Sequence, residues 1–119
     1  LEHIRRHHAR GGIILSVCTG ALIVTSAGLA DGKAIVTHQV GLPLLETMGK
    51  DLRIHPKARV VDNGSIVFSA GVSAGTDAAL YLVARLYGKD VAVKTAQYME
   101  YDWRYTEVDG VSVIDARAE

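Results

Sequence analysis

The amino-acid sequence predicts a single small α/β domain, and three observations support this prediction. The chain has 119 residues, which is enough for one small domain and too few for two. Hydrophobic residues make up 49% of the chain and charged residues 22%, which is an ordinary globular composition. Short apolar runs alternate with segments of helical composition, and this alternation is typical of layered α/β domains.

The first half of the chain alternates helix and strand signals. The apolar run 13–17 suits a strand that is buried on both faces, as in a parallel sheet. The stretch that begins at His38 has apolar residues at three-residue spacing, with Pro43 expected in the first helical turn. We expect helices over 1–10, 22–27 and 38–48, and strands over 13–17 and 33–37.

The second half begins with a polar connection over 53–59 and then a hairpin. Strands are expected over 59–62 and 65–69, because Asn63 and Gly64 between them are a strong two-residue turn signal. A helix over 76–87 ends at Gly88, and Asp90 is expected to cap a further helix that runs to about residue 101. The tail from residue 104 has weak signals, with a short strand expected within 111–114.

The charge balance and the cysteine content limit which classes of protein the chain can belong to. Thirteen Lys and Arg residues match thirteen Asp and Glu residues, so there is no electrostatic reason to expect a nucleic-acid or membrane partner. The basic cluster within 3–10 is expected to be the solvated face of the first helix. No apolar run reaches the ~20 residues that span a bilayer, and no signal-peptide pattern is present. A single cysteine excludes an internal disulfide and favours a reducing, cytoplasmic compartment.

Cys18 is the strongest candidate for chemistry, because it lies where a buried strand turns directly into a helix. Open α/β sheets bind ligands at the carboxyl ends of their strands. The amino end of the following helix favours the thiolate, and its free N–H groups could receive a developing oxyanion. Gly20, two positions later, resembles the second glycine of the hydrolase nucleophile elbow, but the first glycine of that motif is absent. The alternative is a buried, inert cysteine that packs as a small hydrophobe.

Thr19 and His38 each have two interpretations, a role in chemistry at Cys18 and a role in capping their own helix. The Thr19 hydroxyl either hydrogen-bonds the thiolate or substrate, or satisfies the backbone at the start of its own helix. His38 follows the next expected strand, and consecutive parallel strands end at the same edge of a sheet, which makes it a candidate base or orienting group. The alternative for His38 is that it caps its local helix.

The remaining motifs give weaker evidence of a functional site. The glycine-rich segment 69–75 precedes a helix but contains neither a dinucleotide-binding fingerprint nor a Walker lysine, so it is expected to let backbone approach the pocket or to permit close packing. Asp62 and Asp77 are interpreted as a turn residue and a helix first-turn charge. No cofactor and no metal site are expected, since these histidines have no metal-ligand spacing with cysteine or acids: His3, His7, His8 and His55.

Three segments resemble the ThiJ/PfpI superfamily, which has the class I glutamine-amidotransferase-like fold. The resemblance covers roughly residues 1–103, and Glu100-Tyr101-Asp102 resembles a helix end in the isonitrile-hydratase-like branch. The matching segments are Ser16-Val17-Cys18-Thr19-Gly20-Ala21, the stretch from Ala27 to His38, and Ser69-Ala70-Gly71-Val72-Ser73-Ala74-Gly75-Thr76-Asp77.

The resemblance implies a flavodoxin-like three-layer sandwich, commonly a homodimer, that acts on a small electrophilic molecule. It implies that Cys18 is the nucleophile, with Thr19 and His38 beside it as further catalytic residues. It assigns substrate or oxyanion binding to Gly20, Gly71 and Val72. A threonine after the cysteine, in place of the histidine of the protease-like branch, argues against peptidase activity.

The chain departs from the family pattern at its amino end. Members carry an acidic residue early in the domain, near the cysteine, and about half of the family fold precedes the elbow, whereas only 17 residues precede Cys18 here. We therefore expect the C-terminal part of one such domain, incomplete at the N-terminus and taken from a longer protein. The alternative is that dimerisation or swapping covers the exposed sheet edge.

Four functions remain open. The first is an isonitrile-hydratase-like lyase, in which the thiolate adds to an electrophilic carbon and water then releases the product. The second is a glyoxalase or deglycase-like hydrolase activity on reactive carbonyls. The third is a ligand-sensing regulatory domain, which in some relatives precedes a DNA-binding module, and the fourth is an inactive remnant that lacks the acid.

Overall fold

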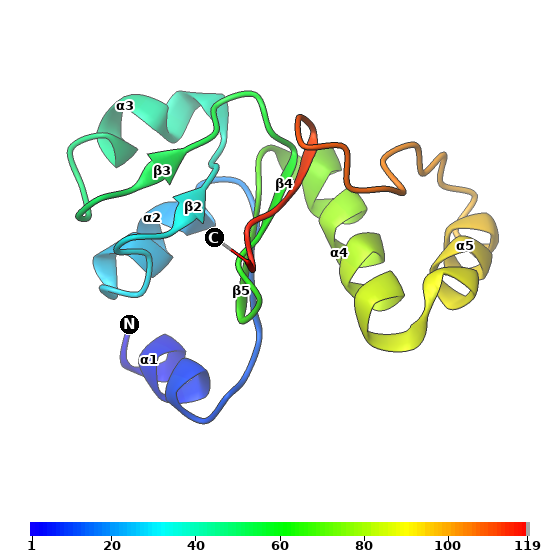
Figure 1. The fold of residues 1–119 in the computed structure, drawn as a ribbon, viewed down its shortest axis with the longest axis horizontal. Coiled ribbons are helices and arrows are strands. Elements are labelled where there is room, and N and C mark those ends of the chain that lie inside the picture. Colours follow the sequence, from blue (N-terminus) through cyan, green and yellow to red (C-terminus); the bar gives the residue numbers. More distant parts are fainter. Residues whose placement is uncertain (119) are drawn as a thin grey trace.

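Apolar runs that the sequence marks as strands form the centre of the fold, and helices cover both of its sides (Figure 1). The computed structural model describes residues 1–118. The α/β prediction is confirmed. The elements are α1 (Glu2–Ala9), β1 (Ile14–Ser16), α2 (Gly20–Ser26), β2 (Ala34–Ile35), the 3-10 helix η1 (Gln39–Gly41), α3 (Leu42–Leu45), β3 (Arg53–Ile54), β4 (Val60–Asp62), β5 (Ile66–Ser69), α4 (Val72–Tyr87), α5 (Lys89–Tyr98) and β6 (Val113–Asp115).

The main sheet has four strands in the order β1-β5-β4-β6. β5 pairs in parallel with β1 and antiparallel with β4, and β4 pairs in parallel with β6. The antiparallel pair is the hairpin expected around Asn63 and Gly64, where Gly64 has a φ of 88° that glycine adopts without a steric penalty. This hairpin makes the sheet mixed. The parallel pairing of β1 with β5 places the carboxyl ends of these two strands at the same edge.

The strands β2 and β3 form a separate two-stranded parallel sheet. The polar connection expected over 53–59 begins with this short strand, which the sequence did not indicate because two residues show no alternation. The Asn63 side chain joins this small sheet to the hairpin. Its Oδ1 accepts a hydrogen bond from the Ala34 N–H at 3.2 Å, and its Nδ2 donates to the Ala34 carbonyl at 2.6 Å.

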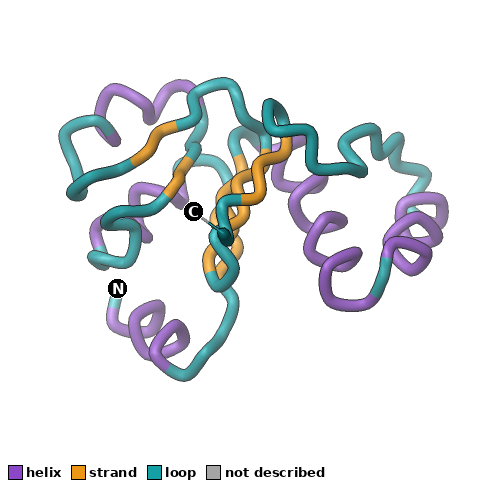
Figure 2. Tube along the Cα trace, viewed as in Figure 1, coloured by secondary structure: helices purple, strands orange, loops and turns teal. Residues whose placement is uncertain are grey.

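Several helices begin or end at residues other than those predicted. The predicted helix 38–48 is η1 followed by the four-residue α3, with a proline at the start of α3 as expected. The helix α4 begins at Val72 instead of residue 76, because packing against the sheet overrides the low helix propensity of the Gly- and Ser-containing segment. Gly88, and not Asp90, is the residue that precedes α5. Irregular chain then leads from α5 to β6 (Figure 2).

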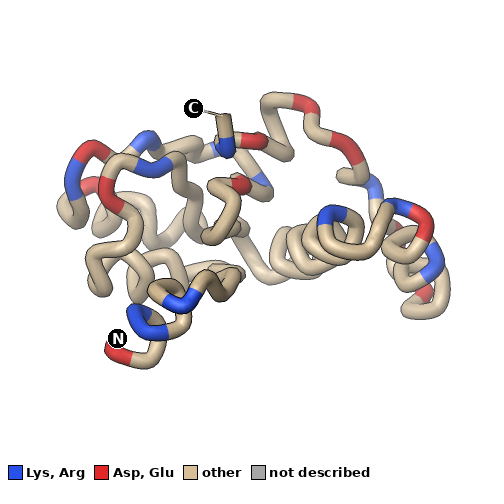
Figure 3. Tube along the Cα trace, turned by 60° about the horizontal axis from the view of Figure 1, so that its bottom comes forward, with Lys and Arg blue, Asp and Glu red and all other residues tan. Residues whose placement is uncertain are grey.

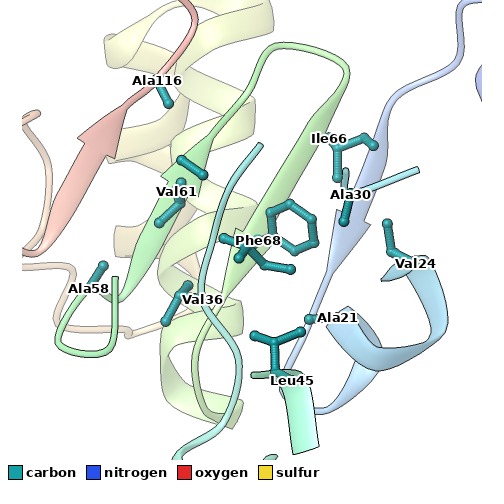
Figure 4. Close-up of a cluster of buried hydrophobic side chains, with 12 residues drawn as sticks. Ala21, Val24, Ala30, Val36, Leu45, Ala58, Val61, Ile66, Phe68 and Ala116 are labelled. Carbon is teal, nitrogen blue, oxygen red and sulfur yellow. The ribbon is translucent and has the colours of Figure 1, made fainter. Parts of the chain in front are cut away.

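Two apolar clusters hold the layers together, one on each side of the sheet. The larger cluster surrounds Phe68, which is fully buried between the sheet, α2 and the segment of β2 (Figure 4). The smaller one joins Val67 of β5 to Ala78 and Leu82 of α4. The helix α5 packs against α4. The sheet thus forms the middle layer of the sandwich.

The surface carries charges of both signs scattered along the chain (Figure 3). The helix α1 has no buried residue, which confirms that the basic cluster within 3–10 is a solvated face. Polar contacts attach this helix to the body: Arg5 Nε donates to the Ala27 carbonyl at 2.9 Å, and His8 Nε2 lies 3.1 Å from Ser65 Oγ. Within residues 1–118, no helix has the length and apolar content that a bilayer span requires.

Candidate functional site

The strand β1 ends at Ser16, and the next four residues make a tight turn into α2. The Val17 carbonyl accepts a hydrogen bond from the Gly20 N–H at 3.0 Å. Cys18 has a φ of 59°, and Thr19 has a φ of −74° and a ψ of 0°. These angles fit a turn of the II′ kind, in which the first central residue takes positive φ. Cys18 therefore occupies the position at which the chain reverses between strand and helix.

A cysteine in this conformation is strained. Positive φ brings Cβ of a non-glycine residue into steric conflict with the adjacent backbone, at a cost of about 1–2 kcal/mol. Such residues persist only where the surrounding structure holds them, and they cluster at functional sites. Cys18 is half-buried and forms no disulfide. The strand–turn–helix arrangement expected at Cys18 is present, and its geometry is that of a nucleophile elbow.

Thr19 and Gly20 begin the helix that follows the sulfur. Thr19 is exposed, and its side chain makes no capping hydrogen bond to α2, so the local capping interpretation of this hydroxyl is not observed. The Gly20 N–H is already paired with the Val17 carbonyl. In this conformation Gly20 therefore has no free amide to offer to an oxyanion, because the turn itself uses that donor.

His38 lies near the elbow, although not for the reason that the sequence suggests. The preceding strand β2 is in the second sheet, so β1 and β2 do not end at one edge of a common sheet. Instead, Thr37 Oγ1 donates a hydrogen bond to the Cys18 carbonyl at 2.8 Å, which ties the two segments together. His38 Nδ1 accepts a hydrogen bond from the Val40 N–H at 3.1 Å and so caps η1, as the local alternative predicts.

The start of α4 completes the surroundings of the elbow. Gly71 precedes the helix, and a Cβ added there would lie 3.6 Å from Cδ2 of His38. Val72 is the first helical residue and is 77% exposed. The first N–H groups of a helix have no intrahelical partner, so this end of α4 has free donors beside His38. The structure thus brings Gly71 and His38 together.

The glycine-rich segment 69–75 brings α4 close to the elbow at Gly75. A Cβ added at Gly75 would lie only 2.6 Å from Cγ1 of Val17, the residue before Cys18. The glycine is therefore required for α4 to approach the turn so closely. This contact is the close packing that the segment 69–75 predicts, but no local pattern could name Val17 as the partner.

The two buried aspartates belong to ion pairs. Asp77 accepts hydrogen bonds from Arg59 Nη2 and the Tyr101 hydroxyl, both at 2.7 Å. Asp62 accepts from Gly64 N–H at 2.7 Å, as a turn residue would, and also from Arg85. Among residues 1–118, no hydrogen bond joins a carboxylate to Cys18, and no three His, Cys, Asp or Glu side chains gather as metal ligands.

Burial and the neighbouring carboxylates also perturb two tyrosines in these ion-pair networks. Desolvation raises the pKa of Tyr81, and its hydrogen bond to Asp62 adds to the effect. Desolvation likewise raises the pKa of Tyr101, together with its hydrogen bond to Asp77. Both hydroxyls therefore stay protonated and act as donors to the aspartates at neutral pH. These networks stabilise the fold beside α4 and are separate from the elbow.

The fold and the elbow define an α/β domain with a cysteine at a strand–helix turn, and known proteins of this class match the chain. An isonitrile hydratase from Pseudomonas putida is 40% identical over 101 residues, which cover 85% of this chain and 43% of that protein. The crystal structure of a ThiJ/PfpI family protein from Pseudomonas syringae is 37% identical, with a TM-score of 0.67 over 76% of this chain and 36% of that one.

A further solved structure supports the fold alone. Drosophila melanogaster DJ-1beta has a TM-score of 0.74 at 22% identity, covering 86% of this chain and 53% of that chain. No family model matches the chain. The homologues and structural neighbours that the chain matches are members of the DJ-1/ThiJ/PfpI superfamily. The chain spans less than half the length of the isonitrile hydratase that it matches.

Proposed function

We propose that the chain provides the nucleophile of a cysteine-dependent enzyme of the isonitrile hydratase kind. The observation that carries this proposal is the strained, half-buried Cys18 at the end of β1, in a chain that is 40% identical to an isonitrile hydratase. A sulfur at such a turn is held at the edge where ligands of open α/β sheets bind.

The reaction needs one nucleophile and one water. The Cys18 sulfur adds to the terminal carbon of an isonitrile, R–N≡C, and that carbon takes up the thiol proton, which gives the thioimidate Cys–S–CH=N–R. Water then adds to the same carbon and the C–S bond breaks. The sulfur recovers a proton, and the product R–NH–CHO leaves. The sum is the addition of one water to the isonitrile, without oxidation or reduction.

The neighbouring groups have distinct roles in this scheme. The Thr19 hydroxyl is free of a capping bond and donates to the substrate nitrogen or the thiolate. Because Nδ1 of His38 accepts the Val40 N–H, the neutral ring carries its proton on Nε2 and acts as a donor or orienting group. The amides of Gly71 and Val72 at the start of α4 are the donors left for developing negative charge, since the turn occupies that of Gly20.

The test follows both steps with the same isonitrile. Intact-mass measurement should show the unmodified chain gaining the mass of one isonitrile, and chromatography should show the formamide. Replacing the nucleophile, Cys18→Ser or Cys18→Ala, should abolish the adduct and lower formamide production by at least about 10³-fold. His38→Gln should keep the adduct and slow its hydrolysis by roughly 10²-fold.

Equal formamide production by the Cys18→Ala variant would end the proposal. A panel of reactive carbonyls run beside the isonitrile separates the second activity from the first, because both use the same sulfur. Turnover of carbonyls with no isonitrile adduct would favour the glyoxalase or deglycase kind of enzyme.

A further inference from the structure

Three successive carbonyls at the elbow are each held by a hydrogen bond. The Ser16 carbonyl accepts from Ser69 Oγ at 3.0 Å, the Val17 carbonyl from the Gly20 N–H at 3.0 Å, and the Cys18 carbonyl from Thr37 Oγ1 at 2.8 Å. We propose that Thr37 and Ser69 are positioning residues that hold Cys18 in its left-handed conformation. This inference deepens the proposed function, because it rests on Cys18 being the reactive group.

The two side chains act on the peptide planes that bracket the turn. The Ser16 carbonyl belongs to the peptide group before Val17, and the Cys18 carbonyl belongs to the one after the cysteine. Because peptide groups are planar, fixing the direction of these two carbonyls leaves little freedom to the φ and ψ angles between them. The bond within the turn fixes the third plane. The two hydroxyls thereby hold Cys18 through its backbone.

Burial makes these bonds hard to replace. Thr37 is 1% exposed and Ser69 is 0% exposed, so both donors are shielded from solvent. A carbonyl that loses a buried donor carries a desolvation penalty, and the turn can relieve it by leaving the strained conformation. Positive φ at a cysteine persists only where its surroundings over-determine it. Thr37 and Ser69 are the side chains that supply this constraint from outside the turn.

The helix α2, which follows the elbow, offers a matched control. Thr25 Oγ1 donates to the Ala21 carbonyl at 2.8 Å, and Thr25 is 5% exposed. This is also a buried hydroxyl on a backbone carbonyl, but the bond stays within α2 and does not reach the elbow. Its removal should lower stability in the same way as loss of the elbow bonds, without altering the position of the sulfur.

The experiment measures the alkylation of Cys18 by iodoacetamide as a function of pH, together with thermal unfolding. The chain has one cysteine, so the label reports on this residue alone. Thr37→Val and Ser69→Ala should slow alkylation of the folded chain by roughly tenfold at each pH, since a displaced sulfur loses its fixed orientation. Thr25→Val should lower the unfolding temperature and leave the alkylation rate and pH profile as in the unmodified chain. Thr37→Ser keeps the hydroxyl, so it should be alkylated at the rate of the unmodified chain.

If Cys18 in the folded Thr37→Val and Ser69→Ala variants is alkylated at the rate of the unmodified chain, the inference is overturned. If Thr37→Val does not fold, Ser69→Ala alone decides, because it removes one oxygen and leaves the packing volume nearly unchanged. Alkylation needs no isonitrile, so the two proposals fail separately. A chain without isonitrile chemistry whose variants still show the expected alkylation pattern would refute the proposed function and leave the positioning role intact.

Discussion

A buried carboxylate and its partners show how single residues set the stability of the region where β4 and β6 end. Asp62 is fully buried and accepts hydrogen bonds from Tyr81 at 2.5 Å and Arg85 at 2.7 Å. Arg117 lies 3.5 Å from Asp62 and also binds Asp115 through two nitrogens, at 2.9 and 2.7 Å. A buried charge is tolerated only when it is paired in this way.

The Asp115–Arg117 pair predicts a pH dependence of stability. The hydrogen bond from Arg117 lowers the pKa of Asp115 to about 2, against burial that opposes it. In the unfolded chain the pKa is about 3.9, so between roughly pH 2 and 4 the unfolded state binds more protons than the folded state. The stabilisation is therefore complete above pH 4 and is lost as the pH falls through this window.

Asp115→Asn should remove this part of the pH dependence. Urea unfolding between pH 2 and 5 should show a shallower rise of the unfolding free energy with pH than in the unmodified chain. The difference should be small, below about 1 kcal/mol, because the pair is partly exposed to solvent. Arg117→Gln should reproduce the change, and an unaltered slope in both variants would contradict it.

At the scale of elements, the approach of α4 to the elbow depends on Gly75, which faces the residue before Cys18. Gly75→Ala would place a methyl group 2.6 Å from Cγ1 of Val17, whose β-branched side chain has few rotamers to escape into. In an unobstructed helix the same substitution would stabilise the chain by about 0.5–1 kcal/mol. Here we expect it to lower the unfolding free energy by about 1–3 kcal/mol through overpacking.

The double variant Gly75→Ala with Val17→Ala tests this explanation. Removing the opposing methyl groups should recover most of the stability that Gly75→Ala loses, as measured by urea unfolding. A double variant as unstable as the sum of the two single changes would show that the contact is not the cause. Such a contact also explains why α4 begins earlier than its composition suggests, since the sheet and the turn hold its first residues.

For the whole molecule, Phe68 has the largest side chain among the fully buried residues, and it lies in the larger of the two clusters (Figure 4). Phe68→Ala should cost about 3–5 kcal/mol, which is a large part of the 5–15 kcal/mol that stabilises a typical domain. Urea unfolding followed by far-UV circular dichroism should therefore show a strongly lowered midpoint. Tyr98→Ala is the control, since Tyr98 is 92% exposed and its loss should change the unfolding free energy by less than about 0.5 kcal/mol. Equal effects of both variants would contradict this account of the core.

Most elements of the fold could be predicted because their signals are local. Apolar runs marked β1 and β5, glycines marked the ends of α1 and α4, and Asn63-Gly64 marked the hairpin. The position of Cys18 between a strand and a helix was readable in the same way. Short elements without periodicity were not, and β3 exists only because β2 lies beside it.

The amino-acid sequence by itself thus determined the α/β class, the order of the main elements and the location of the cysteine at a strand–helix junction. The tertiary structure alone decided the positive φ of Cys18, the pairing of the Gly20 amide and the route by which His38 reaches the elbow. The physical reason is distance along the chain. Thr37 and Ser69 lie 19 and 53 positions from the carbonyls that they bind, and no local pattern records such partners.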